Sequence, residues 1–346
     1  TTTIDLLRER NLLGANKSWT NYSYYFGATE TNLEEIKKLN PKETCGLKVF
    51  MGTSTGTLLV EDDFALEQIF QFCPVTIVTH CEDNETIKNN SDKVNSQNQT
   101  LDAKFHPIIR DDICCYKSSS KVIDLAKKYS SDLHVLHLTT EKEIKLFENI
   151  DLKNKKITCE VCVHHLWFDE SDYEKLGNFI VCNPAIKKVS DRNALRKALK
   201  DGFIDYVATD HAPHSYKDKK LPYGKAPAGI PLIEHSFHMM IELHKQGYYS
   251  LEEVISYMSH KVADRFSIQD RGYVREGYKA DLMMFDLDKT TPVTNDTEKT
   301  KCGWTPFDGH TFSSTVLGTI INGKPIVVDG KLTGDSSSAE QILFDR

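Results

Sequence analysis

The sequence has no long apolar run, so no membrane-spanning helix is expected. No stretch approaches the roughly 20 consecutive apolar residues that a membrane-spanning helix needs. The chain also lacks blocks of lysine and arginine, and its formal net charge of −7 is spread along its length. Neither nucleic acid nor an anionic membrane is therefore expected as a partner, and a small molecule is.

The sequence contains cysteines, but their spacing matches neither a zinc ribbon nor a disulfide framework. The nine cysteines are odd in number, and several lie within apolar runs, which is typical of reduced, buried thiols in a cytoplasmic protein. Cys159 and Cys162 form a C-x-x-C pair, but a strand would place them on opposite faces, so a redox role is not expected. The chain begins at Thr1 without methionine or an apolar leader, which indicates the middle of a longer protein.

Short apolar runs alternate with polar helical patterns, and this alternation is typical of a parallel α/β fold. The predicted strands span residues 22–26, 46–51, 75–80, 134–138, 157–161, 179–182 and 206–209, with helices at 33–39, 64–72, 121–129, 142–149 and 191–199. Seven strands are one short of a (β/α)₈ TIM-type barrel, and a strand upstream of Thr1 would supply the eighth. The polar segment 84–98 is expected to be an exposed insertion.

The pattern changes near residue 270, so two domains are predicted. Residues 1–270 form the barrel, and residues 271–346 form a small β-sandwich appendage built from the chain ends together with a C-terminal tail. Strand-like runs occupy 280–286, 314–321 and 324–329, and Asn322-Gly323 between the last two predicts a hairpin turn.

Polar side chains interrupt four of the predicted barrel strands. Lys48 lies within one apolar run, His80 ends the next, His137 lies within a third and Asp210 ends the last. Each would destabilise a barrel core unless it were paired or bound to a metal. One strand-end histidine is more often structural, and one lysine can extend to the surface, but four interruptions together predict a metal centre.

The segment 208–214, Ala-Thr-Asp-His-Ala-Pro-His, is the most informative part of the chain. It places a carboxylate and imidazoles at the carboxyl end of a buried strand, where barrel enzymes build their active sites on rigid backbone. The sequence therefore predicts an enzyme.

Six segments together resemble the amidohydrolase superfamily and, within it, the dihydroorotase family of zinc-dependent cyclic amide hydrolases. They span residues 46–52, 79–83, 134–137, 160–166, 182–184 and 208–214, and the tail segment 276–282 resembles a returning β-sandwich strand. The resemblance covers nearly the whole chain. The Thr-Asp-His-Ala-Pro-His string is its most discriminating part, since hydantoinases and allantoinases usually differ after the aspartate.

The resemblance implies a metal centre and a reaction. Lys48 would be carboxylated and would bridge two zinc ions, with His80 and His137 as ligands of the second metal and Asp210 as a ligand of the first. A bridging water would be activated as hydroxide. Asp210 would carry its proton to the leaving ring nitrogen. The implied activity is reversible hydrolysis of the cyclic amide of L-dihydroorotate to N-carbamoyl-L-aspartate in pyrimidine biosynthesis.

The resemblance also implies substrate contacts. His214 would face the substrate carboxylate, Asn183 would hydrogen-bond the ring, and the Ala228-Gly229 backbone would line the pocket. A helix cap is the alternative for His214, and ordinary turns are the alternatives for the other three.

One departure from the family pattern is plain. The His-x-His-x-Arg motif of the first barrel strand is absent, so the chain is interpreted as a fragment rather than as a degenerate relative, which would have lost the other ligands as well. His164 and His165 lie beside the implied site and are assigned structural roles. The alternatives are a dihydropyrimidinase, hydantoinase or allantoinase, or a non-catalytic scaffold, and a homodimer or larger homo-oligomer is expected.

Overall fold

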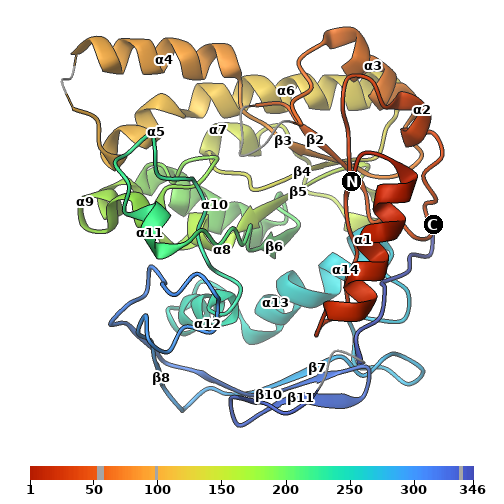
Figure 1. Ribbon diagram of the computed structural model, residues 1–346, viewed down its shortest axis with the longest axis vertical. Coiled ribbons are helices and arrows are strands. Elements are labelled where there is room, and N and C mark those ends of the chain that lie inside the picture. Colours follow the sequence, from red (N-terminus) through yellow and green to blue (C-terminus); the bar gives the residue numbers. More distant parts are fainter. Residues whose placement is uncertain (53–57, 98–99, 335–337) are drawn as a thin grey trace.

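A computed structural model describes residues 1–52, 58–97, 100–334 and 338–346. Its centre is a six-stranded parallel sheet whose strands follow chain order (Figure 1). The strands are β1 (Phe26–Gly27), β2 (Leu47–Phe50), β3 (Ile77–His80), β4 (Leu133–Val135), β5 (Ile157–Cys162) and β6 (Tyr206–Ala208). Parallel strands in sequential order, each followed by helix, fit an α/β barrel.

Helices surround this sheet (Figure 1), and side-chain caps fix where several of them start. The Asp111 carboxylate accepts a hydrogen bond from the Cys114 backbone N–H at the start of α6, a standard N-cap. The α-helices are α1 (Ile4–Lys17), α2 (Leu33–Ile36), α3 (Asp63–Phe72), α4 (Asn84–Gln97), α5 (His106–Ile109), α6 (Asp112–Tyr129), α7 (Glu141–Ile144), α8 (Val163–Trp167), α9 (Tyr173–Leu176), α10 (Val189–Asp201), α11 (Tyr216–Lys219), α12 (Ser236–Lys245), α13 (Leu251–Ile255) and α14 (Lys261–Phe266).

Short 3₁₀ turns and one π-helical turn complete the helical elements. The 3₁₀ turns are η1 (Ala103–Phe105), η2 (Leu152–Asn154), η3 (Glu170–Asp172) and η4 (Gly177–Ile180), and the π-helical turn is η5 (Ser256–His260). No helix in the described part of the chain is long and apolar enough to cross a membrane.

A second, antiparallel sheet lies beneath α12 and α13 (Figure 1). Its order is β12 (Lys331–Leu332), β11 (Lys324–Val328), β10 (Thr315–Ile321) and β7 (Leu282–Asp286), and β8 (Thr291–Pro292) pairs separately with β9 (Thr311–Phe312). The hairpin at Asn322-Gly323 is confirmed, since Ile321 pairs with Lys324 and both turn residues have positive φ, as a type I′ turn requires. The two-layer sandwich stays a prediction.

The C-terminal tail packs at the amino ends of the barrel strands. The Arg346 guanidinium donates to the Cys45 carbonyl, just before β2, at 3.1 Å, and Phe344 joins a buried cluster with Val78 and Tyr206. This end of the barrel is thereby filled, and the carboxyl ends of the strands are left for the site.

One predicted strand is wrong. In the predicted strand 179–182, residues 180–182 are buried and Phe179 is partly buried, but the segment begins in the 3₁₀ turn η4 rather than in the sheet. The Val181 carbonyl accepts hydrogen bonds from the Gly229 N–H at 2.8 Å and from the Lys219 ammonium at 3.3 Å. Contacts with loops therefore replace the hydrogen bonds of a sheet, and within the described residues the central sheet has six strands rather than the seven predicted.

The segment predicted as an exposed insertion is helical. It forms α4 over Asn84–Gln97, and Thr86 and Val94 lie on its buried side. The last predicted position, Asn98, lies outside the described residues.

Candidate functional site

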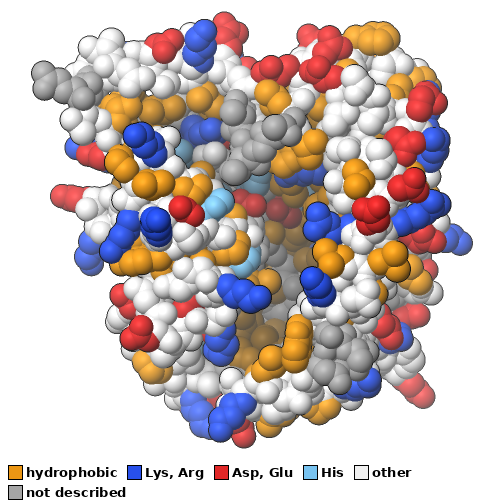
Figure 2. Space-filling model, viewed as in Figure 1, with side chains coloured by type: hydrophobic (Ala, Val, Ile, Leu, Met, Phe, Trp, Pro, Cys, Tyr) orange, Lys and Arg blue, Asp and Glu red, His pale blue; other side chains and the backbone are white. Residues whose placement is uncertain are grey.

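Four polar side chains meet at the carboxyl end of the parallel sheet. Lys48 comes from β2, His80 ends β3, His137 follows β4 by two residues and Asp210 follows β6 by two. The Nδ1 atom of His80 lies 3.1 Å from the Nε2 atom of His137, and Asp210 interacts electrostatically with both Lys48 and His80. Figure 2 shows this face hollowed, with histidine and acidic side chains in the walls of the hollow.

The backbone is left-handed at two of these four positions. His137 has φ 40° and Asp210 has φ 44°. Residues other than glycine rarely adopt this conformation, which costs of order 1 kcal/mol and persists where the surrounding structure enforces it, often at functional sites. At His137 the turn ends β4, although the Leu136 and Leu138 N–H groups still bond to the neighbouring strands.

Burial changes the ionisation of Lys48. Desolvation lowers the pKa of its ammonium, and the nearby carboxylates of Asp210 and Glu160 oppose this shift. Its Nζ atom lies 4.6 Å from the centre of the Phe50 ring, so one side of the amine faces an aromatic wall. A lowered pKa increases the fraction of neutral amine, which is the form that can react with CO₂.

Burial also shifts the pKa values of His137 and Asp210. Burial lowers the pKa of His137 well below its usual value, with His80 and Lys48 adding to the effect, so this imidazole is neutral. Asp210 is exposed at the mouth, yet protein packed around its carboxyl group raises its pKa by desolvation, against opposing effects of Lys48 and His80. Imidazole nitrogens and a carboxylate form a ligand set suited to zinc.

Glu82 holds the far side of the His80 ring. Its Oε2 atom lies 3.0 Å from the His80 Nε2 atom, and the same oxygen accepts a hydrogen bond from the Arg110 guanidinium. Glu82 is completely buried, and Arg110 and His80 outweigh its desolvation and lower its pKa to about 2. The ionised carboxylate accepts a hydrogen bond from the Nε2–H of His80, and the Nδ1 atom of His80 is the nitrogen that faces His137.

These side chains are better suited to binding a metal ion than to satisfying one another's hydrogen bonds. The Nδ1 atom of His80 and the Nε2 atom of His137 face each other at 3.1 Å, a separation that leaves room for at most one proton between them. The Nδ1 atom of His137 is buried and has no hydrogen-bond partner among the described residues. Lys48, His80, His137 and Asp210 are the residues that could hold metal here.

Asn183 is positioned by a histidine that the sequence analysis did not assign. The Nε2 atom of His106 lies 2.9 Å from the Cys182 carbonyl and 3.1 Å from the Asn183 Oδ1 atom, and its Nδ1 atom lies 2.9 Å from the Tyr223 hydroxyl. Burial lowers the pKa of His106 to about 4. The neutral ring therefore donates from Nε2, and the Asn183 NH₂ group is left to donate to a ligand.

His214, Ala228 and Gly229 form one loop contact. The Nε2 atom of His214 lies 2.9 Å from the Ala228 carbonyl. Gly229 has φ 143°, and a Cβ atom there would lie 2.6 Å from the Ala212 carbonyl oxygen and 2.9 Å from the His214 ring. Only glycine fits this close approach, so the three predicted substrate contacts lie together.

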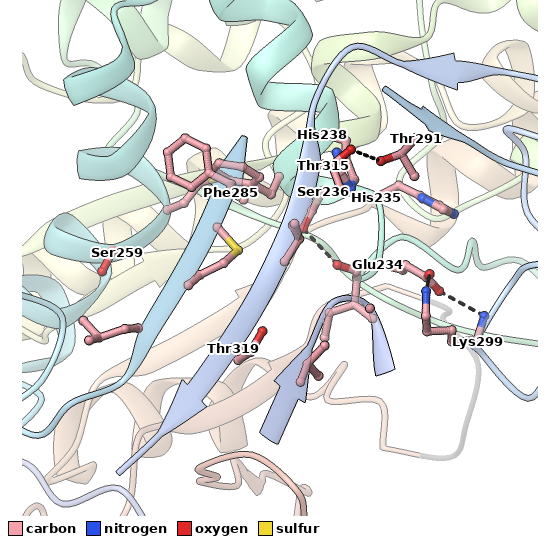
Figure 3. A pocket seen from close by; sticks show the side chains of 18 of the residues that line it. Glu234, His235, Ser236, His238, Ser259, Phe285, Thr291, Lys299, Thr315 and Thr319 are labelled. Carbon is pink, nitrogen blue, oxygen red and sulfur yellow. Dashed lines mark hydrogen bonds and ion pairs between the residues drawn. The ribbon is translucent and has the colours of Figure 1, made fainter. Parts of the chain in front are cut away.

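A separate cavity of about 960 Å³ lies away from these groups. It is bounded by α12, η5 and the sheet strands β7 and β10, and Figure 3 shows Phe285, Ser259 and Thr319 around it. None of the four polar groups lines this cavity, and its walls are mostly apolar.

Sequence reasoning missed several groups near the site, and only some left a signal. Glu82 lies two residues beyond His80, the spacing that keeps side chains on one face of an extended segment. Glu160, on β5, interacts electrostatically with Lys48 and Asp210. His106 gives no local signal, because its contact with Asn183 joins residues 77 positions apart.

Comparisons with known proteins agree on the family. The sequence profile described as the amidohydrolase family matches residues 67–326. The chain is 26% identical over 323 residues to a dihydroorotase of Methanothermobacter thermautotrophicus, covering 92% of this chain and 71% of that protein. It is 31% identical over 257 residues to a dihydroorotase of Bacillus pumilus, covering 74% and 59%.

The chain thus spans roughly 59–71% of the length of these two relatives. Among solved structures, L-hydantoinase (dihydropyrimidinase) from Arthrobacter aurescens superposes with a TM-score of 0.90 at 24% identity, covering 99% of this chain and 78% of that one. At that identity the likeness concerns the fold alone, and it supports an α/β barrel.

Proposed function

The chain belongs to the amidohydrolase family, and from this premise we propose that it is part of a metal-dependent dihydroorotase. The reaction is the reversible hydrolysis of the cyclic amide of L-dihydroorotate to N-carbamoyl-L-aspartate. The proposal is supported by the dihydroorotases to which the chain is similar over most of its length.

One observation carries the chemistry: Lys48, His80, His137 and Asp210 converge from four strands onto one point at the carboxyl end of the sheet. In this proposal Lys48 in its carboxylated form, the ring nitrogens of His80 and His137, and the carboxylate of Asp210 would hold two zinc ions. Bound metal would supply polarisation of the amide carbonyl and a lowered pKa for the attacking water.

Asp210 has a second task in this proposal. Water adds to the ring carbonyl carbon, the carbon–nitrogen bond breaks, and the leaving nitrogen needs a proton. Asp210 takes the proton from the attacking water and delivers it to that nitrogen. Desolvation raises the pKa of its carboxyl group, which moves the group toward the neutral range where a base that must also return its proton works best.

Asn183 and His214 orient the substrate. The Nε2–H of His106 donates to the Oδ1 atom of Asn183, so the NH₂ group of Asn183 remains to donate to a ring carbonyl of the substrate. The Nε2 atom of His214 lies against the Ala228 carbonyl, so the other ring nitrogen, Nδ1, is the one that would donate to the substrate carboxylate.

The experiment is ultraviolet measurement of L-dihydroorotate ring opening by the full-length protein, with hydantoin and dihydrouracil as competing substrates. Preferential consumption of dihydroorotate supports the proposal. Turnover of the uncharged rings instead would assign the protein to the hydantoinases or dihydropyrimidinases, whose fold it shares.

A Lys48→Ala variant tests the metal centre in the same assay. Loss of the bridging ligand should remove bound metal and activity together. Turnover like that of the unmodified protein would contradict the role of Lys48, and a zinc-loaded protein that turns over none of the three rings would favour a non-catalytic scaffold.

A further inference from the structure

A second group of metal-ligating side chains lies beside the four described above. Cys162 ends β5, and His164 and His165 stand in the short helix α8 that follows it. One ligand atom from each of the three residues lies within 4.8 Å of the others. All three are buried, with 0%, 1% and 3% of their surfaces exposed.

His164 is anomalous for a buried histidine. Neither of its ring nitrogens has a hydrogen-bond partner within the described ranges. Buried polar atoms are nearly always paired, because an unpaired one costs about 1–3 kcal/mol. Burial also lowers the pKa of His164 to about 3, so the ring is neutral and one nitrogen carries a free lone pair.

The tautomer of His165 is fixed by its neighbour. Its Nε2 atom lies 3.1 Å from the Pro184 carbonyl oxygen, which can only accept, so Nε2 carries the proton. The Nδ1 atom then carries the lone pair, and it too lacks a partner in the described part of the chain. A histidine that donates one N–H to a backbone carbonyl and presents the other nitrogen is the usual arrangement of a metal ligand.

The side chain of Cys162 lies near two carboxylates. Burial raises the pKa of its thiol well above the usual value, and Glu160 and Asp210 add to this effect, opposed by Lys48. The same two carboxylates attract a cation. The opposite face of β5 differs, since the Cys159 thiol points to the Phe203 carbonyl oxygen at 3.6 Å. The two cysteines of the C-x-x-C pair therefore have different environments.

We propose that Cys162, His164 and His165 form a separate metal site for a borderline divalent cation such as Zn²⁺. One thiolate and two imidazoles are a donor set that zinc accepts, with a fourth position left for water. Binding displaces the thiol proton to solvent. Because all three side chains are buried, the ion is taken up as the protein folds.

The site is distinct in kind from the catalytic centre proposed above, whose ligands are nitrogen and oxygen atoms only. A sulfur–metal bond therefore reports on the new site alone. Replacing zinc by Co²⁺ in the full-length protein tests this, because thiolate ligation of Co²⁺ produces a charge-transfer absorption that nitrogen and oxygen ligands do not.

The expected result is a thiolate–cobalt absorption in the unmodified protein. It should be lost in Cys162→Ser, a nearly isosteric change that keeps the fold. It should persist in the matched control Cys159→Ser, on the same strand, and in Lys48→Ala, which lacks the proposed bridging ligand. Zinc content measured by mass spectrometry should fall by one ion per chain in Cys162→Ser relative to Cys159→Ser.

Three results would overturn the proposal. A fully cobalt-loaded unmodified protein without the sulfur band would do so, and that measurement needs no variant. Persistence of the band in Cys162→Ser would assign the sulfur to another cysteine. Loss of the band in Lys48→Ala as well would place Cys162 in the catalytic centre. Because the readout is spectroscopic, the proposed reaction can fail while this site stands, and the reverse also holds.

Discussion

The Nε2 atom of His80 lies 3.0 Å from the Oε2 atom of Glu82. This contact leaves Nδ1 as the nitrogen of His80 that faces His137, and it ties a candidate metal ligand to a completely buried, ionised carboxylate. The pair has the form of a carboxylate–histidine–metal arrangement, in which the outer carboxylate orients the ring and raises its basicity.

Replacing Glu82 should therefore weaken metal binding without removing a ligand. We expect Glu82→Gln to lower the affinity for zinc by about 10–100-fold, the usual effect of removing such a carboxylate. Competition with a chelator, followed by metal analysis, measures this. Glu85→Gln, the same change at an exposed position three residues further on, is the control, and equal affinities in the two variants would contradict the orienting role.

Proton transfer can be separated from metal binding at Asp210. Asp210→Asn keeps the shape and an oxygen ligand but removes the base, so kcat for dihydroorotate should fall by about 10²–10⁴-fold. Part of the bound metal should remain. Steady-state kinetics and metal analysis on the same preparation check this, with Asp124→Asn on the exposed side of α6 as the control. A kcat within a few-fold of normal would rule out Asp210 as the proton carrier.

Substrate recognition should depend on His214. His214→Ala removes the only part of this residue that can reach a carboxylate, so we expect KM for dihydroorotate to rise by about tenfold or more, as for the loss of a charge-assisted hydrogen bond. Zinc content should not change. Any activity on hydantoin, which has no carboxylate, should be affected much less. Equal losses on both substrates would indicate a structural role instead.

The stability of the folded protein at acid pH should depend on the protonation of His106. Its pKa is about 4 in the folded protein and near 6.5 in the unfolded chain. Above pH 6.5 both states are neutral and the group has no effect. As the pH falls from about 6.5 to about 4, only the unfolded chain takes up the proton, so folding stability falls, in total by about 3 kcal/mol.

His106→Gln keeps a donor for the Cys182 carbonyl but cannot titrate. The slope of the free energy of unfolding against pH should therefore decrease by up to about 1.4 kcal/mol per pH unit near pH 5. Urea unfolding at several pH values measures that slope. An unchanged slope would mean that the folded protein binds this proton as readily as the unfolded chain does.

Much of the barrel could be predicted from the sequence, because buried parallel strands produce apolar runs with an unmistakable length and composition. Polar residues interrupting those runs, such as Lys48 and His80, stood out for the same reason. The hairpin at Asn322-Gly323 was predictable because its turn chemistry is local.

The failures have physical causes of their own. Residues 179–182 are as apolar as a strand, but Lys219 and Gly229, distant in sequence, satisfy the Val181 carbonyl. Composition made 84–98 resemble an exposed insertion, although a few buried positions such as Val94 are enough to hold α4 against the protein. The contact between His106 and Asn183 was out of reach, since local spacing says nothing about pairs that only the fold brings together.

Gly229 limits which positions at the mouth of the site can be substituted. Its backbone angle and the close approach of Ala212 and His214 leave no room for a side chain, so only glycine can occupy this position. Altering substrate preference, by natural drift or by directed evolution, must therefore proceed through neighbouring loop positions such as Ala226 and Pro227, which are partly open to solvent. A mutant library for this loop should vary those positions and keep glycine at 229.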